Sequence, residues 1–141
     1  MRASFLVAVL VAVSSLSGCV VVASGNGERG DRQMREQGWD KLGERWVNGQ
    51  SDKDRIEVGR ADGKFRQLMI VVEHSAVDLD AFDVEFANGS HFTPELRARF
   101  DENSRSRVID LPGDARTIRH ITFRAGNIPG GGRAQIEVWG R

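Results

Sequence analysis

The sequence predicts an all-β protein, a single jelly-roll-like β-sandwich of about eight antiparallel strands. Apolar residues recur at every second position, as in Leu68, Ile70 and Val72, and this is the period of a half-buried strand. Turn-forming pairs such as Asn88-Gly89 separate these runs at short intervals. Short, evenly spaced strands joined by tight turns are typical of a sandwich or barrel.

The alternating runs and the turn residues between them place the strands in chain order. We expect strands near residues 39–47, 55–60, 64–73, 77–87, 90–100, 105–111, 116–125 and 133–140. The fifth of these is ambiguous, because Phe92, Leu96 and Phe100 also fit one face of a helix. We prefer a strand, and Pro94 would confine it to a sheet edge because proline has no N–H to donate.

Two turns predict the register of the strands that flank them. Residues 61–63 and 87–89 read Ala-Asp-Gly and Ala-Asn-Gly, and a third-place glycine suits a three-residue hairpin loop that ends in the left-handed conformation. A two-residue loop would turn the following strand over. The apolar pairs expected across the two hairpins are Ile56 with Leu68 and Val84 with Phe92.

Residues 1–18 match a lipoprotein signal peptide. Arg2 supplies the charged start and residues 5–13 the apolar centre, which is too short to span a membrane. The motif at residues 16–19, Leu-Ser-Gly-Cys, resembles a lipobox, and Cys19 is the only cysteine. The thiol directly after the cleavage point would carry the lipid. We therefore expect Cys19 to be lipidated with acyl chains such as palmitate, which anchor the protein to a membrane.

Where the anchored protein would reside follows from the residue after the thiol. Val20 follows Cys19, and since no aspartate stands there nothing argues for retention at an inner membrane. We expect the outer membrane, with the protein facing the periplasm. The alternative is an ordinary signal cut after Ala23, which removes Cys19 and leaves a soluble periplasmic or secreted protein.

Residues 19–38 read as a flexible tether between the lipid and the domain. The stretch from residue 24 to residue 32 is small, polar and glycine-rich, with little to bury. The β-sandwich domain is expected to occupy residues 39–141. With Cys19 used for lipid, the domain has no thiol and must be held together by packing.

Four stretches of the chain resemble a known family. They are residues 39–43 (WDKLG), 52–59 (DKDRIEVG), 107–113 (RVIDLPG) and 137–140 (EVWG). The chain from residue 39 to residue 141 is similar to an uncharacterised family of small secreted bacterial β-sandwich proteins, a domain-of-unknown-function group that includes proteins of the YaaI type. The resemblance implies the sandwich fold and brings no catalytic residue with it.

The sequence lacks the motifs that would indicate an enzyme or a cofactor. The chain has 20 basic and 20 acidic residues, so no net field draws it to nucleic acid. It has no Gly-x-Ser-x-Gly elbow, no phosphate-binding loop and no His-x-His spacing. Glu73, His74, Asp78 and Asp80 surround one turn and are a candidate divalent-cation site, although the polar face of a strand gives the same pattern. We expect no catalytic residue, no metal and no cofactor.

Trp39, Trp46 and Trp139 are the remaining candidates for ligand binding. An exposed tryptophan on a sandwich face commonly binds a sugar ring, which lies flat against the apolar indole with polar groups beside it. Trp139 is out of phase with Ile136 and Val138, so it should point away from the main core. Packing at a sheet edge is the alternative for all three, and it is preferred because aromatic burial is the larger energy.

These observations together indicate a cell-envelope lipoprotein. We expect a non-catalytic binding or interaction module at the membrane surface, with an envelope polymer or protein as its partner. The alternatives are a small glycan-acting hydrolase and, if Cys19 is removed, a free periplasmic ligand-binding protein. A stripe of arginines in the C-terminal half, interleaved with acids, is interpreted as a solvated face, with contact to anionic envelope polymers or lipid headgroups as the alternative.

Overall fold

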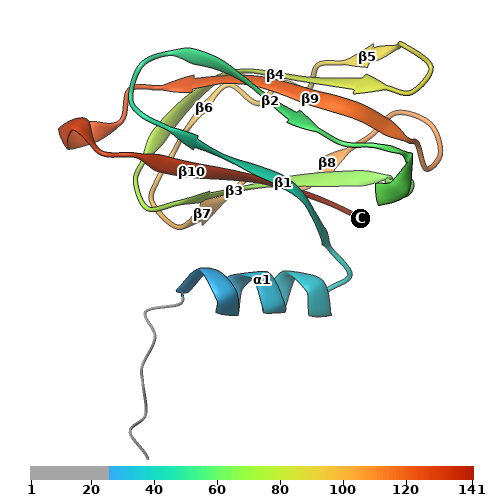
Figure 1. Cartoon of the computed structure of the whole chain (residues 1–141), viewed down its shortest axis with the longest axis horizontal. Helices are drawn as coiled ribbons and strands as arrows, with labels where there is room; N and C mark the ends of the chain where they lie inside the picture. The colour runs from blue at the N-terminus through green and yellow to red at the C-terminus, as the bar shows by residue number, and fades with distance from the viewer. Residues whose placement is uncertain (1–25) are drawn as a thin grey trace, which may run out of the picture.

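The computed structural model describes residues 26–141, which fold into two facing antiparallel sheets and one helix (Figure 1). The predicted all-β sandwich is confirmed. In chain order the elements are α1 (Asn26–Glu36), β1 (Asp40–Val47), β2 (Asp52–Glu57), the 3₁₀ turn η1 (Arg60–Asp62), β3 (Gln67–Glu73), β4 (Val77–Phe86), β5 (His91–Phe92), β6 (Ala98–Phe100), β7 (Ser104–Arg105), β8 (Ile109–Asp110), β9 (Ile118–Gly126), the 3₁₀ turn η2 (Pro129–Gly131) and β10 (Ala134–Gly140).

Each sheet joins strands that are distant in sequence. Sheet A has the order β1-β10-β3-β7, with β8 also paired to β3, and sheet B has the order β2-β9-β4-β5, with β6 also paired to β4. Strands β5 to β8 are only two or three residues long. The long strand pairings in the middle of each sheet are therefore β3 with β10 and β4 with β9.

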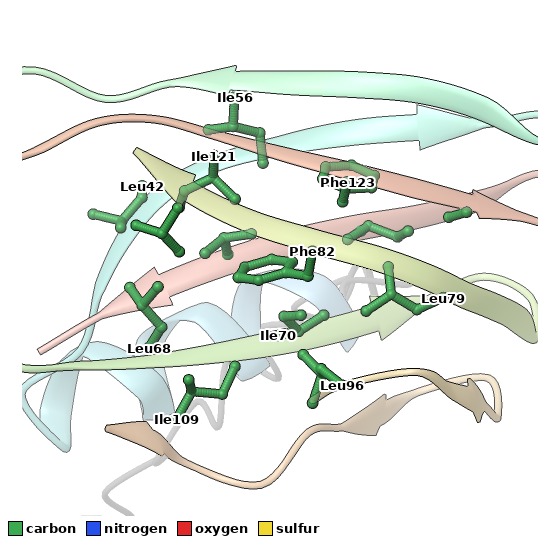
Figure 2. Close-up of a cluster of buried hydrophobic side chains, with 14 of the residues drawn as sticks. Leu42, Ile56, Leu68, Ile70, Leu79, Phe82, Leu96, Ile109, Ile121 and Phe123 are labelled. Carbon is green, nitrogen blue, oxygen red and sulfur yellow. The ribbon is translucent and has the colours of Figure 1, made fainter. Parts of the chain in front are cut away.

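The main core lies between the two sheets and is built from the alternating apolar residues. Leu68 and Ile70 point inward from β3, and Phe82 and Val84 point inward from β4; all four are at most 2% exposed. Figure 2 shows these inner faces, with side chains of both sheets filling one shared interior. This burial is the main stabilising contribution to the fold, because the described part of the chain has no disulfide.

One predicted register is confirmed and the other is wrong. Val84 lies opposite Phe92, and Gly89 has a φ of 83°, as the three-residue hairpin requires. Ile56, however, pairs with Ile121 of β9, and Leu68 lies in the other sheet. Residues 60–62 form η1, where the Gly59 N–H donates to the Asp62 carboxylate at 2.9 Å. The turn therefore carries the chain from sheet B to sheet A instead of closing a hairpin.

The ambiguous segment 92–100 contains no helix. It forms two short strands, β5 and β6, which both pair with β4 at the edge of sheet B. Pro94 lies in the gap between them, where no ladder hydrogen bond is needed from its nitrogen. The predicted strand at 105–111 is likewise divided into β7 and β8, both on β3.

Residues 26–36, predicted as part of a flexible tether, form the helix α1. Gly38 ends the helix with a φ of 82°, and the Trp39 N–H donates to the Met34 carbonyl at 3.0 Å. This is a Schellman arrangement, in which the hydrophobic contact between Met34 and Trp39 reinforces the cap. The signal peptide, Cys19 and the rest of the predicted tether lie outside the described residues.

Helix α1 packs on the outer face of sheet A, away from the main core (Figure 1). Met34 is 1% exposed and forms a second apolar cluster with Trp39, Val71 and Trp139. As a result every residue of β10 is buried, on both faces of the sheet. No helix within residues 26–141 has the length and apolar character needed to cross a membrane.

Candidate functional site

The outer face of sheet B is the broad sheet surface that α1 leaves uncovered, and it carries most of the polar chemistry of the domain. The side chains on β2, β9 and β4 form rows across the strands, since paired residues of neighbouring strands lie side by side. The rows are Lys53–Arg124–Ala81, Arg55–Thr122–Asp83 and Glu57–His120–Glu85, the last continued by His91 of β5. We call this surface the sheet B face.

The same alternation that fills the core places these residues on the outside. Ile121 and Phe123 of β9 point inward and are at most 1% exposed, while Thr122 between them lies on the other side. A shallow hollow of about 450 Å³ lies over this surface and is open to solvent. It reaches from Lys53 on β2 to His91 on β5.

On one side of the hollow, a carboxylate is paired with a histidine. The His91 Nδ1–H donates to Asp83 Oδ2 at 2.8 Å, and the Thr93 hydroxyl donates to Asp83 Oδ1 at 2.9 Å. The hydrogen bond to Asp83 raises the pKa of His91 above its ordinary value, and the charges of Asp83 and Glu85 act in the same direction. Both carboxylate oxygens of Asp83 thus accept a hydrogen bond from a protein side chain, one from His91 and the other from Thr93.

Glu85 is held by three neighbouring side chains. His120 Nε2 lies 2.8 Å from Glu85 Oε2, and Arg119 Nη1 donates to Oε1 at 2.8 Å. His91 Nε2 is 3.7 Å from the same Oε2 atom. These basic groups balance the charge of Glu85. Because its side chain is also only 15% exposed, it offers little to a ligand.

The cations on the opposite side of the hollow have little negative charge beside them, whereas the acids are surrounded by basic groups. Lys53 lies directly opposite Arg124 on neighbouring strands. Neither has an acidic partner among the side chains that the structure describes. Arg55 makes only an exposed contact of 3.7 Å with Glu57. Like charges directly opposite each other destabilise a sheet by roughly 0.2–1 kcal/mol, so this arrangement costs stability when nothing is bound.

The two histidines of this face contact carboxylates and no nucleophile that the structure describes. Both histidines are oriented by carboxylates, which is one part of a nucleophilic site, but no hydroxyl or thiol accepts or donates a hydrogen bond at either imidazole within residues 26–141. No group of three or more metal-ligating side chains in the described part of the chain is arranged to hold an ion. The face presents Lys53, Arg55 and Arg124 beside hydrogen-bonding groups, and of these three cations only Arg55 has an acidic neighbour among the described side chains.

The three tryptophans predicted as ligand-binding residues lie elsewhere. As predicted, Trp139 points away from the main core, but α1 covers it, and Trp39 is buried in the same cluster. Neither ring has surface to offer a ligand. Trp46 is 45% exposed on sheet A, with the ring of His74 at 4.9 Å and the guanidinium carbon of Arg133 4.9 Å from its ring centre.

The residues considered for a divalent cation are drawn apart by different partners. Asp78 accepts hydrogen bonds from Asn127 at 2.7 Å and from Arg99 at 2.8 Å, and these hydrogen bonds lower its pKa. Asp80 lies 3.7 Å from Arg97, and His74 packs on Trp46. Glu73, the fourth candidate, lines a different hollow beside α1, and the four therefore do not converge on one point.

A second polar cluster attaches α1 to sheet A. Lys41 contacts Glu137 at 2.5 Å and both Asp31 of α1 and Glu44 at 3.0 Å. Burial disfavours the charged Lys41, but these hydrogen bonds together outweigh burial and raise its pKa. Burial also raises the pKa of Glu137, opposed by hydrogen bonds from Lys41 and Trp139. Since every group here has a partner, the cluster is best explained as the attachment of the helix.

The sheet B face was missed in the sequence because its signal is weak. Lys53, Arg55, Thr122 and Arg124 occupy the polar positions of predicted strands, and any solvated strand has polar positions. That β2 pairs with β9 cannot be read from the local pattern. The arginines of the expected C-terminal stripe do not form one surface: Arg105 lies on β7 of sheet A, whereas Arg124 lies on the sheet B face.

Fold and site together define a β-sandwich protein with one sheet covered by an N-terminal helix and the other presenting an open, cation-bearing face. The chain belongs to the family described as a domain of unknown function, DUF2541, whose sequence profile matches residues 6–140. Among solved structures, the chain is similar to AlgX of Pseudomonas aeruginosa, at 12% identity and a TM-score of 0.45. That match covers 72% of this chain and 26% of the AlgX chain. No curated protein matches the sequence.

Proposed function

We propose that this protein is a non-catalytic binding module of the bacterial cell envelope, anchored by lipid at Cys19, that binds its ligand on the sheet B face. The observation that carries the proposal is the Lys53–Arg124 pair beside the open hollow, for which the described side chains provide no acidic partner. The repulsion between two like charges on neighbouring strands lowers the stability of the folded protein. A bound anionic group would remove this repulsion.

The position of the helix supports an anchored arrangement. Helix α1 lies against sheet A, on the opposite side of the domain from sheet B (Figure 1). Cys19 precedes α1 by only a few residues in the sequence, so lipid at that residue would tether the protein on its sheet A side. The sheet B face would then be directed away from the anchoring membrane, towards ligands in the surrounding compartment. This YaaI-type lipoprotein would reside at the outer membrane and face the periplasm.

Binding is favoured over hydrolysis by the state of the acidic groups. A glycan-acting hydrolase needs two carboxyl groups available to substrate, one as an acid and the other as a base or nucleophile. Asp83 and Glu85 are instead engaged by His91, Thr93, His120 and Arg119. We therefore assign them to organising the face, and assign contact with the ligand to the cations.

The anchoring part is tested by replacing the thiol. The wild-type protein and Cys19→Ala are expressed in their native bacterium, separated into membrane and soluble fractions, and the mature N-terminus is measured by mass spectrometry. We expect wild type in the membrane fraction with a diacylated Cys19, and loss of membrane association in Cys19→Ala. A wild-type N-terminus that begins at Ser24 and carries no lipid would contradict the anchor.

The binding part is tested by filling the hollow without changing its charge. Ala81 is exposed and lines the hollow, so Ala81→Trp occupies the space and keeps a residue type that strands accept. The full chain in neutral detergent is mixed with total envelope polysaccharide and sedimented. We expect wild type and the control Ala61→Trp, at an exposed position in η1, to co-sediment, and Ala81→Trp to remain in solution. Release of reducing sugar by wild type would favour a hydrolase instead.

A further inference from the structure

The sheet B face carries a surplus of usable positive charge, which identifies the chemistry of its ligand. Both acids beside the hollow have protein partners within 3 Å: Asp83 has His91, and Glu85 has His120 and Arg119. Among the described side chains, Lys53 and Arg124 have no acidic partner, and Arg55 has only the exposed Glu57, at 3.7 Å. A ligand on this face therefore meets positive charge, although the whole chain has a formal net charge of zero.

The cations are spaced along the strands in a way that suits a repeating anion. Lys53 and Arg124 form one row, and Arg55 lies two residues further along β2. Two residues of a strand span about 6.6 Å, so the face offers two successive positions for negative groups. A single small anion would neutralise one position and leave the other unpaired.

The surface around the cations is polar and open. The Thr122 hydroxyl and the His91 imidazole line the same hollow, and each can exchange hydrogen bonds with hydroxyl groups. Among the described residues the only large apolar side chain that is exposed is Trp46, which lies on the other sheet. The face thus has nothing to insert into a lipid bilayer.

We infer that the ligand of the sheet B face is an acidic polysaccharide, whose carboxylate groups are bound by Lys53, Arg124 and Arg55. This inference rests on the proposed function and deepens it by naming the ligand class. Arginine binds carboxylate in a planar, two-pronged geometry and lysine as a point charge. The sugar hydroxyls would lie over Thr122 and His91. The face would then recognise the polymer by ion pairs to its carboxylates and by hydrogen bonds to its hydroxyl groups.

The test uses polygalacturonate as the probe, with the full chain in neutral detergent at low ionic strength. Wild type is compared with the double variant Lys53→Glu/Arg124→Glu. The matched control is Arg60→Glu/Lys64→Glu, which makes the same charge change at exposed positions away from this face. Circular dichroism and urea unfolding check folding, and Lys53→Gln/Arg124→Gln replaces the reversal variant if that one is unfolded.

We expect wild type to bind polygalacturonate, and to bind uncharged dextran at least about tenfold more weakly because the ion contacts are missing. The face variant should lose about tenfold or more in affinity, and the control should change by less than about twofold. Raising the salt to 0.5 M should weaken wild-type binding, because exposed charges are screened.

Three results would overturn the inference. They are equal binding of dextran and polygalacturonate, equal losses in the face variant and the control, and preferential binding of phosphatidylglycerol vesicles through the same cations, which would make a membrane the ligand. The proposed function is judged separately. If Ala81→Trp abolishes binding to envelope polysaccharide while polygalacturonate is not bound, the face is a binding site and only the assigned ligand class is wrong.

Discussion

The indole Nε1–H of Trp139 donates a 2.9 Å hydrogen bond to Oε2 of Glu137, two residues earlier on the same strand, beneath α1. The other carboxylate oxygen of Glu137 accepts from Lys41. Both Trp139 and Glu137 are at most 2% exposed. A buried charge is tolerated only when it is paired and hydrogen-bonded, so this relationship makes the outer face of sheet A dependent on Lys41.

Replacing Lys41 with methionine should be strongly destabilising. The change leaves the buried Glu137 carboxylate with Trp139 as its remaining hydrogen-bond donor, and removing one partner of a buried pair costs about 3–5 kcal/mol. The free energy of unfolding from urea titration at pH 7 measures the loss. Glu44→Gln is the control, because Glu44 is an exposed partner of the same lysine and should cost at most about 1 kcal/mol. Equal losses in the two variants would contradict the assignment.

The loss in Lys41→Met should also depend on pH. Burial already raises the pKa of Glu137, and removal of Lys41 takes away a contribution that lowers it. An acid whose pKa is raised on folding destabilises the folded state as the pH rises through that pKa, because the folded state then has to hold the charge. The stability difference between wild type and Lys41→Met should therefore be smaller at pH 5 than at pH 7. A difference that grows at pH 5 would argue against a buried Glu137 charge.

Met34→Ala should release α1 from the sheet. Met34 is the buried helix residue in the cluster with Trp39, Val71 and Trp139, and removing a buried methionine side chain costs about 2–5 kcal/mol. We expect faster proteolysis after residues 29–35 and a red shift of tryptophan fluorescence as the two indoles meet water. Gln33→Ala, at an exposed position of the same helix, should change neither. A Met34→Ala protein as protease-resistant as wild type would indicate that other contacts hold the helix.

Gly140→Ala should destabilise the sandwich because the added methyl has no room. A Cβ at residue 140 would stand 2.6 Å from a ring carbon of Phe65 and 3.1 Å from Leu42. Overpacking of this kind costs about 1–3 kcal/mol. Gly59→Ala is the matched control, since its nearest neighbour would lie at 4.0 Å and its φ is −153°. Thermal unfolding of the two variants compares them, and similar Tm values would mean that the strands shift to make space.

His91→Gln should lower stability at acidic pH and have little effect at alkaline pH. The pKa of His91 is raised on folding by its hydrogen bond to Asp83. The stabilisation is therefore complete below the unfolded pKa of about 6.5 and is lost as the pH rises through the folded value. Urea unfolding of both proteins at pH 5.5 and pH 8.5 measures the difference. An effect of equal size at both pH values would contradict a charged Asp83–His91 pair.

The amino-acid sequence by itself determined where the strands lie and which residues face the core. Alternation is a local property, so Leu68, Ile70 and Val72 reveal an inward face without knowledge of the neighbouring strands. The Val84–Phe92 register was also predictable, because the turn that sets it lies within the same hairpin. The prediction failed where a similar turn, residues 61–63, connects two sheets.

Only the tertiary structure decided what covers each sheet and which charges stand together. Helix α1 has little apolar content of its own, and it is held by Met34 packing on Val71 and Trp139, residues far away in the chain. Lys53 and Arg124 look like ordinary solvated residues until β2 pairs with β9. Long-range strand pairing depends on how the whole core packs, and so the local pattern contains no record of it.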